Sequence, residues 1–469
     1  MGSQRRRLLV ALGAGAVTTL AGCGGDGDSN TTSSPTDDVS QNETASSEET
    51  EGSTDDEQAE SPSIKYQSAK LIPDDGDSDD RFGQSIEISS DGDTAVLATP
   101  NAGSAYVFTQ SDGTWEEEAK LTAEDSNSDD NFGYSVGMSD DGSSIIIGAN
   151  RDKNSNNDNE GSAYVFTRSD STWEQQAKFT GNSGDATNRF GHSVGLSSDG
   201  NTAVIGAVTR DDPDGIGVVS QGLLYVYTWS DESWQQQAKI AAKDSNGSGG
   251  SFRGSLTVSS DGSTAIIGDV DYEDGTGIVY VFSQSEGNWQ QRTRFTPTSG
   301  DSTDTFGCSI DLSNNGGTAI IGAFRDEDPN GRLAGSAYIF TQSNEGWQEQ
   351  TKLAAKDGDD GDFFGHSVGI SSDGSTAIIG ANDDNDPNGF GTGSAYVFTQ
   401  SDGSWQQQTK LAADDAEGNR PGDDGRVQSD SFGSPIAVSS DASTAIIGAP
   451  GDKNQNGESA GSAYVFEFK

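Results

Sequence analysis

The chain has 469 residues, of which 76 are Asp or Glu, 27 are Lys or Arg, and only two each are Cys and His. So few nucleophiles, bases and soft metal ligands argue against an ordinary enzyme, and a net charge of −49 argues against nucleic acid or anionic lipid as partners. Trp, Tyr and Phe recur at regular intervals, which separates the chain from a disordered acidic polymer.

The excess of acid predicts residence in a very salty medium, as for proteins of halophilic archaea. Repulsion among carboxylates strains a compact state when the Debye length is about 8 Å, near physiological salt, and much less when it falls to about 3 Å at molar salt. The alternative is a generic solvated acidic surface.

Residues 1–23 have the pattern of an export signal that ends in a lipid-attachment site. Residues 5–9 read RRRLL and precede an apolar stretch that is shorter than the roughly 20 residues needed to span a bilayer. The arginines resemble a twin-arginine export signal, and LAGC at 20–23 resembles a lipobox, in which Cys23 carries the lipid. The alternative is that Cys23 is an ordinary thiol. The pattern predicts a lipid-anchored protein on the outer face of the cytoplasmic membrane.

Residues 24–63 contain 12 Asp plus Glu, 15 Ser plus Thr and no Lys or Arg, and so predict a disordered, extended stalk. Sequons make Asn30 and Asn42, and Asn246 further on, candidate glycosylation sites. Cys308 is the only cysteine after Cys23, so the mature body cannot form an intrachain disulfide and depends on packing.

Residues 64–469 consist of seven copies of one unit. The dipeptide Phe-Gly opens six copies, a degenerate form opens the seventh, and each copy continues to GSAYVF or a variant of it. The copies begin at Phe82, Phe132, Phe190, Phe252, Phe306, Phe364 and Phe432. Such repetition indicates a repeat architecture.

Each unit predicts four antiparallel strands, as the sixth copy illustrates. FGHSVGISSDGSTAIIGA predicts two strands joined by a tight turn at Asp373-Gly374, which tolerates the positive φ of a two-residue hairpin. GSAYVFTQ is apolar on both faces, as expected between neighbouring sheets. SWQQQTKLA alternates apolar and polar residues and is therefore expected to be half-exposed and outermost.

Four strands repeated seven times without helical periodicity predict an all-β fold, a seven-bladed β-propeller of four-stranded antiparallel blades. The seventh copy ends after its third strand, at GSAYVFEFK. The segment Ile64–Leu71, IKYQSAKL, has the ending of an outer strand. We predict that it pairs beside Tyr464–Phe468 and closes the ring.

The segments FGYSVGMSDDGSSIIIGA, FGHSVGLSSDGNTAVIGA and FGSPIAVSSDASTAIIGAP resemble the FG-GAP repeats of the integrin α-subunit propeller, and GAP at 448–450 preserves the namesake tripeptide. The resemblance extends over residues 64–469. It implies a surface protein whose loops recognise proteins or glycans. In such a meander the second-to-third and blade-to-blade loops share one face. Here they are long and differ between copies, so we expect ligands on that face.

Three of these loops begin like a calcium loop, with alternate Asp or Asn before a Gly. Their candidate ligands are Asp326, Asp328 and Asn330; Asp384, Asp386 and Asn388; and Asp452, Asn454 and Asn456. Each loop lacks the closing carboxylate, and the integrin-type calcium loop lies between the first two strands, so the family's calcium sites are not carried over. One interpretation is bound calcium or another cation; the other is solvated turns whose Asp and Asn cap backbone groups.

Catalytic interpretations find little support in the sequence. The position after Phe-Gly is occupied by unrelated residues in the different copies, among them His192, His366 and Cys308. We interpret this position as a tolerant slot on the inner strand. It offers no partners that would make these side chains a catalytic base or nucleophile. A carboxylate pair that acts on a glycoside stays open, because an acidic face offers many pairs. Trp residues of the outer strands are interpreted as blade packing rather than sugar platforms.

The sequence therefore predicts a binding or adhesion module for extracellular protein or glycan ligands, attached to the membrane only through its lipid, without a certain cofactor and without nucleic acid as a partner. The alternatives are a polysaccharide hydrolase or lyase and a purely structural envelope protein.

Overall fold

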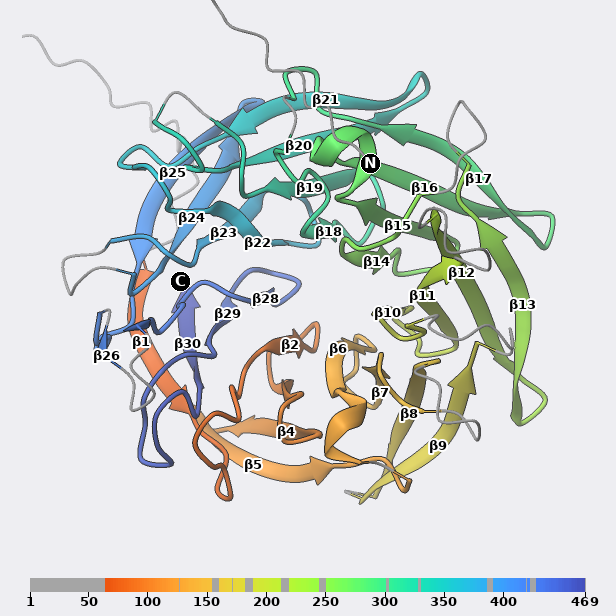
Figure 1. Ribbon diagram of the computed structural model, residues 1–469, viewed down its shortest axis with the longest axis horizontal. Helices are drawn as coiled ribbons and strands as arrows, with labels where there is room; N and C mark the ends of the chain where they lie inside the picture. The colour runs from red at the N-terminus through yellow and green to blue at the C-terminus, as the bar shows by residue number, and fades with distance from the viewer. Residues whose placement is uncertain are drawn as a thin grey trace, which may run out of the picture. The chain divides into compact units, whose positions relative to one another are not determined.

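Seven four-stranded antiparallel sheets stand around a central axis (Figure 1). The computed structural model describes residues 64–125, 127–153, 160–170, 172–181, 189–211, 219–243, 250–300, 303–327, 330–385, 391–418, 420–421 and 427–468, all within the compact unit Glu60–Lys469. The predicted all-β, seven-bladed propeller is thereby confirmed.

Each blade uses its strands in the same order from the axis outward. The inner strands are β2 (Ser85–Ile88), β6 (Phe132–Met138), β10 (Ser193–Leu196), β14 (Leu256–Val258), β18 (Ile310–Leu312), β22 (Phe364–Ile370) and β28 (Ile436–Val438). The second strands are β3 (Thr94–Thr99), β7 (Ser144–Ala149), β11 (Thr202–Asp211), β15 (Thr264–Asp269), β19 (Thr318–Ala323), β23 (Thr376–Ala381) and β29 (Thr444–Ala449).

The third strands are β4 (Ser104–Ser111), β8 (Ser162–Ser169), β12 (Val219–Ser230), β16 (Ile278–Ser285), β20 (Ser336–Ser343), β24 (Ser394–Ser401) and β30 (Ser462–Phe468). The outer strands are β5 (Thr114–Leu121), β9 (Thr172–Thr180), β13 (Ser233–Ala241), β17 (Asn288–Phe295), β21 (Gly346–Leu353), β25 (Ser404–Leu411) and β1 (Ile64–Leu71). The loops add the pair β26 (Arg420–Pro421) and β27 (Val427–Gln428) and two 3-10 turns, η1 (Ser128–Asp130) and η2 (Tyr272–Gly275).

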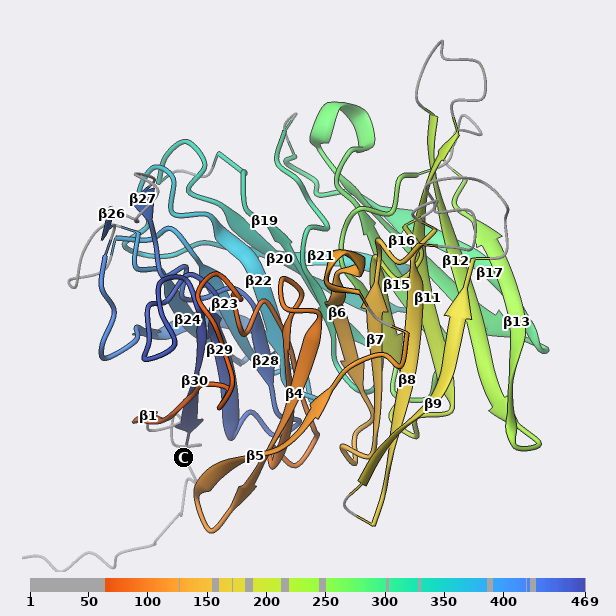
Figure 2. The same ribbon diagram turned by 60° about the horizontal axis from the view of Figure 1, so that its bottom comes forward.

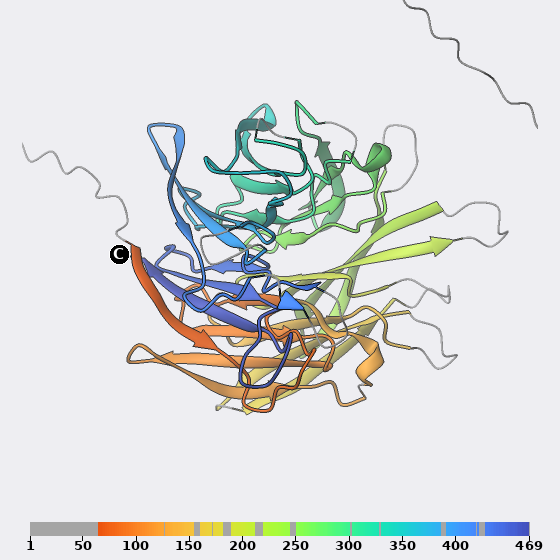
Figure 3. The same ribbon diagram turned by 60° about the vertical axis from the view of Figure 1, so that its left-hand side comes forward.

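The ring closes through β1, which lies antiparallel along β30 (Figure 3). The pairing extends from Ile64 opposite Phe468 to Leu71 opposite Ala463. The last blade therefore contains strands from both ends of the described chain, as predicted.

The burial of the strands follows their order. In the sixth blade the first five residues of β24 are all buried, whereas β25 alternates between exposed and half-buried residues before its buried end at Leu411. A strand between two neighbouring sheets has no solvent-facing side, which is why both faces of GSAYVF are apolar.

The Phe that opens each copy packs edge to face on the buried tyrosine of its own blade. Phe82 is fully buried, and its ring meets Tyr106 and Phe108 of its own blade edge to face, at 5.7 and 5.9 Å between centroids. The glycine that opens GSAYVF lies close to the backbone of the next blade. Gly161, with φ of 79°, forms a parallel bridge with Phe190, and a Cβ atom on Gly161 would overlap the Phe190 backbone. Only a residue without Cβ fits that position.

The predicted two-residue turn between the first two strands is wrong. The backbone N–H of Ser371 donates to the carbonyl of Thr376, so four residues form the loop, and Gly374 has a φ of 73°. Asp373 instead accepts hydrogen bonds from Ser371 Oγ and the Ser375 N–H, at 2.6 and 2.9 Å. This side-chain turn competes with the shorter hairpin. The two-residue turn occurs between the third and fourth strands, where Asp402 and Gly403 both have positive φ.

The two faces of the ring differ. On one face, turns between first and second strands join neighbouring blades through six backbone hydrogen bonds: Ser90 N–H to Asp140, Asp140 to Ser198, Ser198 to Ser260, Asn314 to Ser372, Ser372 to Ser440 and Ser440 to Ser90. The opposite face, here named the loop face, carries the second-to-third and blade-to-blade loops, η2 and the β26–β27 hairpin (Figure 2). Among the described residues no helix is long and apolar enough to cross a membrane.

Candidate functional site

The first Asp of each predicted calcium loop lies inside the protein rather than in a solvated turn. Asp326, Asp384 and Asp452 are each no more than 3% exposed. Each is joined to an outer-strand lysine and to the buried tyrosine of its blade.

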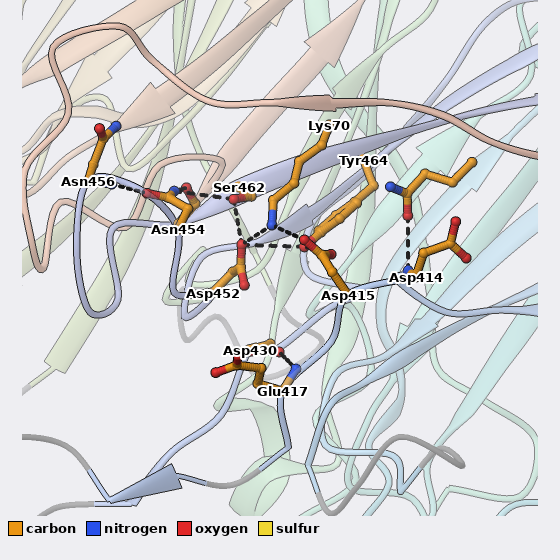
Figure 4. A network of polar contacts seen from close by, with 12 residues as sticks. Lys70, Asp414, Asp415, Glu417, Asp430, Asp452, Asn454, Asn456, Ser462 and Tyr464 are labelled. Atoms are coloured by element: carbon orange, nitrogen blue, oxygen red, sulfur yellow. Dashed lines mark hydrogen bonds and ion pairs between the residues drawn. The ribbon is translucent and has the colours of Figure 1, made fainter.

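The network in the closing blade shows the arrangement (Figure 4). Lys70 Nζ lies 2.8 Å from Asp452 Oδ2 and 2.6 Å from Asp415 Oδ2, and 5.0 Å from the centroid of the Tyr464 ring. The Tyr464 hydroxyl donates to both carboxylates, and Ser462 Oγ donates to Asp452 at 2.6 Å. Lys70 of β1 thus joins the loop that precedes β28 to the loop that follows β29.

These contacts shift the ionisation of the network. Burial alone would lower the pKa of Lys70, but the hydrogen bonds and charges of Asp415 and Asp452 outweigh it and raise that pKa. Burial opposes ionisation of Asp415, yet the bonds from Lys70 and Tyr464 hold its pKa below the usual value. The folded structure therefore stabilises the charged forms of both Lys70 and Asp415.

The network repeats around the ring. In the second and sixth blades a lysine again joins one buried Asp of the second-to-third loop and one half-exposed Asp of the preceding blade-to-blade loop. The members are Lys178 with Asp152 and Asp125, and Lys410 with Asp384 and Asp357. In the fifth blade Lys352 pairs with Asp326, and in the first Lys120 pairs with Asp75. We name these the rim networks.

Sequence reasoning missed the rim networks although a signal was present. The buried Asp precedes the Tyr by 12 residues in four copies, at Asp152, Asp326, Asp384 and Asp452. In the blades where the lysine follows, it stands 14 residues after the Tyr, as Lys410 does after Tyr396. The repeat of this spacing marks a structural triad.

The remaining candidate ligands are held by other groups where they are described. Asn454 Oδ1 accepts from the Asn456 N–H at 2.8 Å, and Asn456 Nδ2 donates to the carbonyl of Pro73 at 2.9 Å. Asn330 Nδ2 donates to the carbonyl of Ala355. In the part of the chain that is described, no group of three or more His, Cys, Asp or Glu could hold a metal ion. The calcium interpretation stays a prediction.

Several predicted residues lie outside the described residues: Cys23, Asn30, Asn42, Asn246, Asp328, Asp386 and Asn388. Their roles in lipidation, glycosylation and cation binding stay predictions.

A channel of about 540 Å³ follows the axis of the ring and is lined by the seven inner strands. The tolerant slot after Phe-Gly supplies its lining on the loop-face side: Gln84, Tyr134, His192, Cys308, His366 and Ser434. The position predicted to lie on the inner strand thus forms the mouth of the channel.

Both histidines at the mouth are neutral over the ordinary pH range. The His192 ring stacks on Tyr134 at 5.1 Å, and His366 Nδ1 lies 3.0 Å from Ser434 Oγ. Burial lowers the pKa of His366 to about 4. Burial, with a smaller effect of Arg189 and Arg253, lowers that of His192 to about 4.

Two carboxylates from different blades interact inside the channel. Burial and the charge of Asp311 raise the pKa of Glu87 to about 8. Burial raises the pKa of Asp311 to about 6, although its two oxygens accept backbone hydrogen bonds from Leu312 and Ile370, both at 2.8 Å. Like charges in one enclosed space disfavour double ionisation.

A second cavity of about 440 Å³ opens beside the channel mouth and shares Arg253, Cys308 and His366 with it. Loops of the fourth and fifth blades complete its wall: Val270, Asp271, Gly275, Thr303, Thr305, Phe324 and Arg325. We name this cavity the side pocket. Two arginines against one carboxylate make it basic, in a chain whose net charge is −49.

The family model described as FG-GAP repeat matches residues 66–108, 115–166, 173–227, 289–340, 347–398 and 405–466. The three inner strands of the fourth blade, β14, β15 and β16, lie between the third and fourth matches. No curated protein matches the chain.

Proposed function

We propose that this chain, which belongs to the FG-GAP repeat family, is a binding module that holds extracellular protein or glycan ligands on its loop face. The observation that carries the proposal is the side pocket: it opens at the channel mouth, between loops that differ from blade to blade on a ring of repeated sheets. Variable loops on a rigid scaffold are the usual location of recognition.

The proposal includes a cell-surface location. The export-signal pattern, the lipobox ending at Cys23 and the acidic segment 24–63 support a lipid anchor and a spacer that keeps the ring away from the membrane. Mass spectrometry of the membrane fraction tests this part: a diacylglyceryl group on Cys23 is expected, and an unprocessed residue 1 would contradict it.

A binding screen tests the function. Full-length chain is applied to glycan and surface-protein arrays at molar salt, with and without a chelator. We expect selective binding to a small set of ligands. If the array stays blank in both arms, the binding function is rejected; if binding disappears only with chelator, the calcium interpretation gains its first support.

A polysaccharide hydrolase or lyase is the second candidate, favoured by Glu87 and Asp311, whose pKa values differ within one cavity. Two carboxylates in different protonation states suit glycoside cleavage. Incubation with acidic and neutral polysaccharides distinguishes it, because an enzyme releases reducing ends or unsaturated products and a binding module releases neither.

A further inference from the structure

We propose that the side pocket binds the carboxylate of a uronic acid residue, which makes acidic glycans the ligand class of this module; the inference rests on the proposed binding function. The argument uses the charge of the pocket, its aromatic wall and its hydroxyl groups.

Arg325 supplies an unpaired positive charge. Its side chain is exposed, and among the described residues it has no ion-pair partner, while its guanidinium carbon lies 5.3 Å from the centroid of the Phe324 ring. An arginine without an ion-pair partner keeps its donors available for a planar carboxylate, which it binds through two parallel hydrogen bonds.

Arg253 adds a second donor group. Its Nη1 lies 3.0 Å from Asp271 Oδ2, and its Nε is buried without a hydrogen-bond partner among the described residues. The Arg253 side chain is 34% exposed, so part of its guanidinium is accessible to a ligand carboxylate. His366, the other titratable group that lines the pocket besides Cys308 and Asp271, is neutral and does not repel either arginine.

The walls suit a sugar better than an acidic peptide. Phe324 lines the pocket and packs against Phe363 and His366, at 5.6 and 5.3 Å between centroids, so it provides an apolar part of the wall for the C–H groups of a sugar ring. Thr303, Thr305 and the half-exposed carboxylate of Asp271 face the same cavity and match hydroxyl groups, which Asp and Glu side chains lack. A volume of about 440 Å³ lies within the usual size of small-ligand sites.

At high salt, an anionic ligand has to be held by direct contact with the arginines of the side pocket. At molar salt, charge attraction beyond about 3 Å is screened, so a distant basic patch would attract no anion. Contact inside a pocket is screened much less.

The test titrates full-length chain with trigalacturonate at 2 M NaCl, with its methyl ester and an aspartate tripeptide as matched probes. We expect saturable binding of the trigalacturonate and at least a tenfold weaker affinity for the ester, which keeps the sugar and removes the charge. Equal affinity for the ester, or tighter binding of the peptide, would overturn the assignment.

Two variants on one loop locate the site. Both Arg325 and Arg332 are exposed and lie between β19 and β20, but only Arg325 lines the side pocket. Arg325→Gln should weaken trigalacturonate binding about 10- to 100-fold, as expected for loss of a charged hydrogen bond, whereas Arg332→Gln should leave it within twofold. Unchanged binding by Arg325→Gln overturns the pocket.

Cys308 gives a readout that does not depend on substitution. Its thiol lines both cavities, and burial raises its pKa, so its reaction with iodoacetamide is followed at pH 9 by peptide mapping. Saturating trigalacturonate should slow the modification at least fivefold. Binding without protection of Cys308 contradicts the location. A chain that binds other ligands on the array and ignores uronates retains the proposed function and refutes this inference alone.

Discussion

The rim networks and the mouth of the channel both concentrate charge under the loop face, but they hold it differently. At the rim, each lysine is neutralised by aspartates, and the same residues return at the same spacing in several blades. At the mouth, Arg325 has no ion-pair partner among the described residues, and its neighbours in the side pocket come from the fourth, fifth and sixth blades without repeating from blade to blade.

This difference separates the repeated positions that maintain the fold from the positions that vary between blades. In the fourth blade the motif is Phe-Arg-Gly instead of Phe-Gly-x, so Arg253 replaces the usual glycine and Gly254 replaces the usual channel-lining side chain. Any Cβ at Gly254 would overlap the backbones of Gly268 and Gly307, so this order is required locally. The departure from the motif thus places Arg253 at the side pocket, whose other lining residues come mainly from the fourth and fifth blades.

Withdrawal of salt should have the largest effect on both regions at once. With a net charge of −49, repulsion among exposed carboxylates grows as the Debye length increases. We expect the melting temperature to fall progressively from 2 M to 0.1 M NaCl, measured by circular dichroism. An unchanged melting temperature across this range rejects the salt-adaptation account.

Loss of one rim lysine should be the most damaging single substitution. Lys70→Met removes the cation that pairs with Asp452, whose side chain is 2% exposed, and loosens β1 from the closing blade. Removing one partner of a buried pair costs about 3–5 kcal/mol. Lys120→Met is the matched control, because its partner Asp75 is 57% exposed and such pairs contribute under about 1 kcal/mol. Equal losses in urea denaturation would contradict the distinction between buried and exposed rim pairs.

Ionisation inside the channel should lower stability as pH rises. The pKa of Glu87 is about 8 in the folded chain, above its ordinary value of 4.5, so the stability that the protonated group provides is complete below pH 4.5 and is lost as pH approaches 8. Glu87→Gln should flatten this slope and gain about 1 kcal/mol or more at pH 8, since each tenfold change in proton affinity corresponds to about 1.4 kcal/mol. Glu116→Gln, at an exposed position of β5, should leave the slope unchanged.

The repetition made the fold predictable, because seven copies of one pattern identify strands, their order and the closing role of Ile64–Leu71. The rim network of the closing blade was hidden for a physical reason: Lys70 and Asp452 lie at opposite ends of the repeat region and meet only once the ring closes. The side pocket was hidden for the opposite reason. Its residues do not repeat, and spacing cannot indicate that Arg253 and Arg325 line one cavity.

The smallest expected change in stability is that of Arg325→Gln, and it distinguishes a residue that binds ligand from one that maintains the fold. Arg325 is exposed and unpaired among the described residues, so Arg325→Gln should change the free energy of unfolding by no more than about 0.5 kcal/mol while weakening uronate binding. A residue of the rim should behave in the reverse way: Lys120→Met, distant from the side-pocket lining, should leave binding intact at a temperature where it stays folded. If Arg325→Gln destabilises the chain as much as Lys70→Met does, the mouth is part of the framework, and the division between repeated residues that hold the ring and unique residues that bind ligands fails.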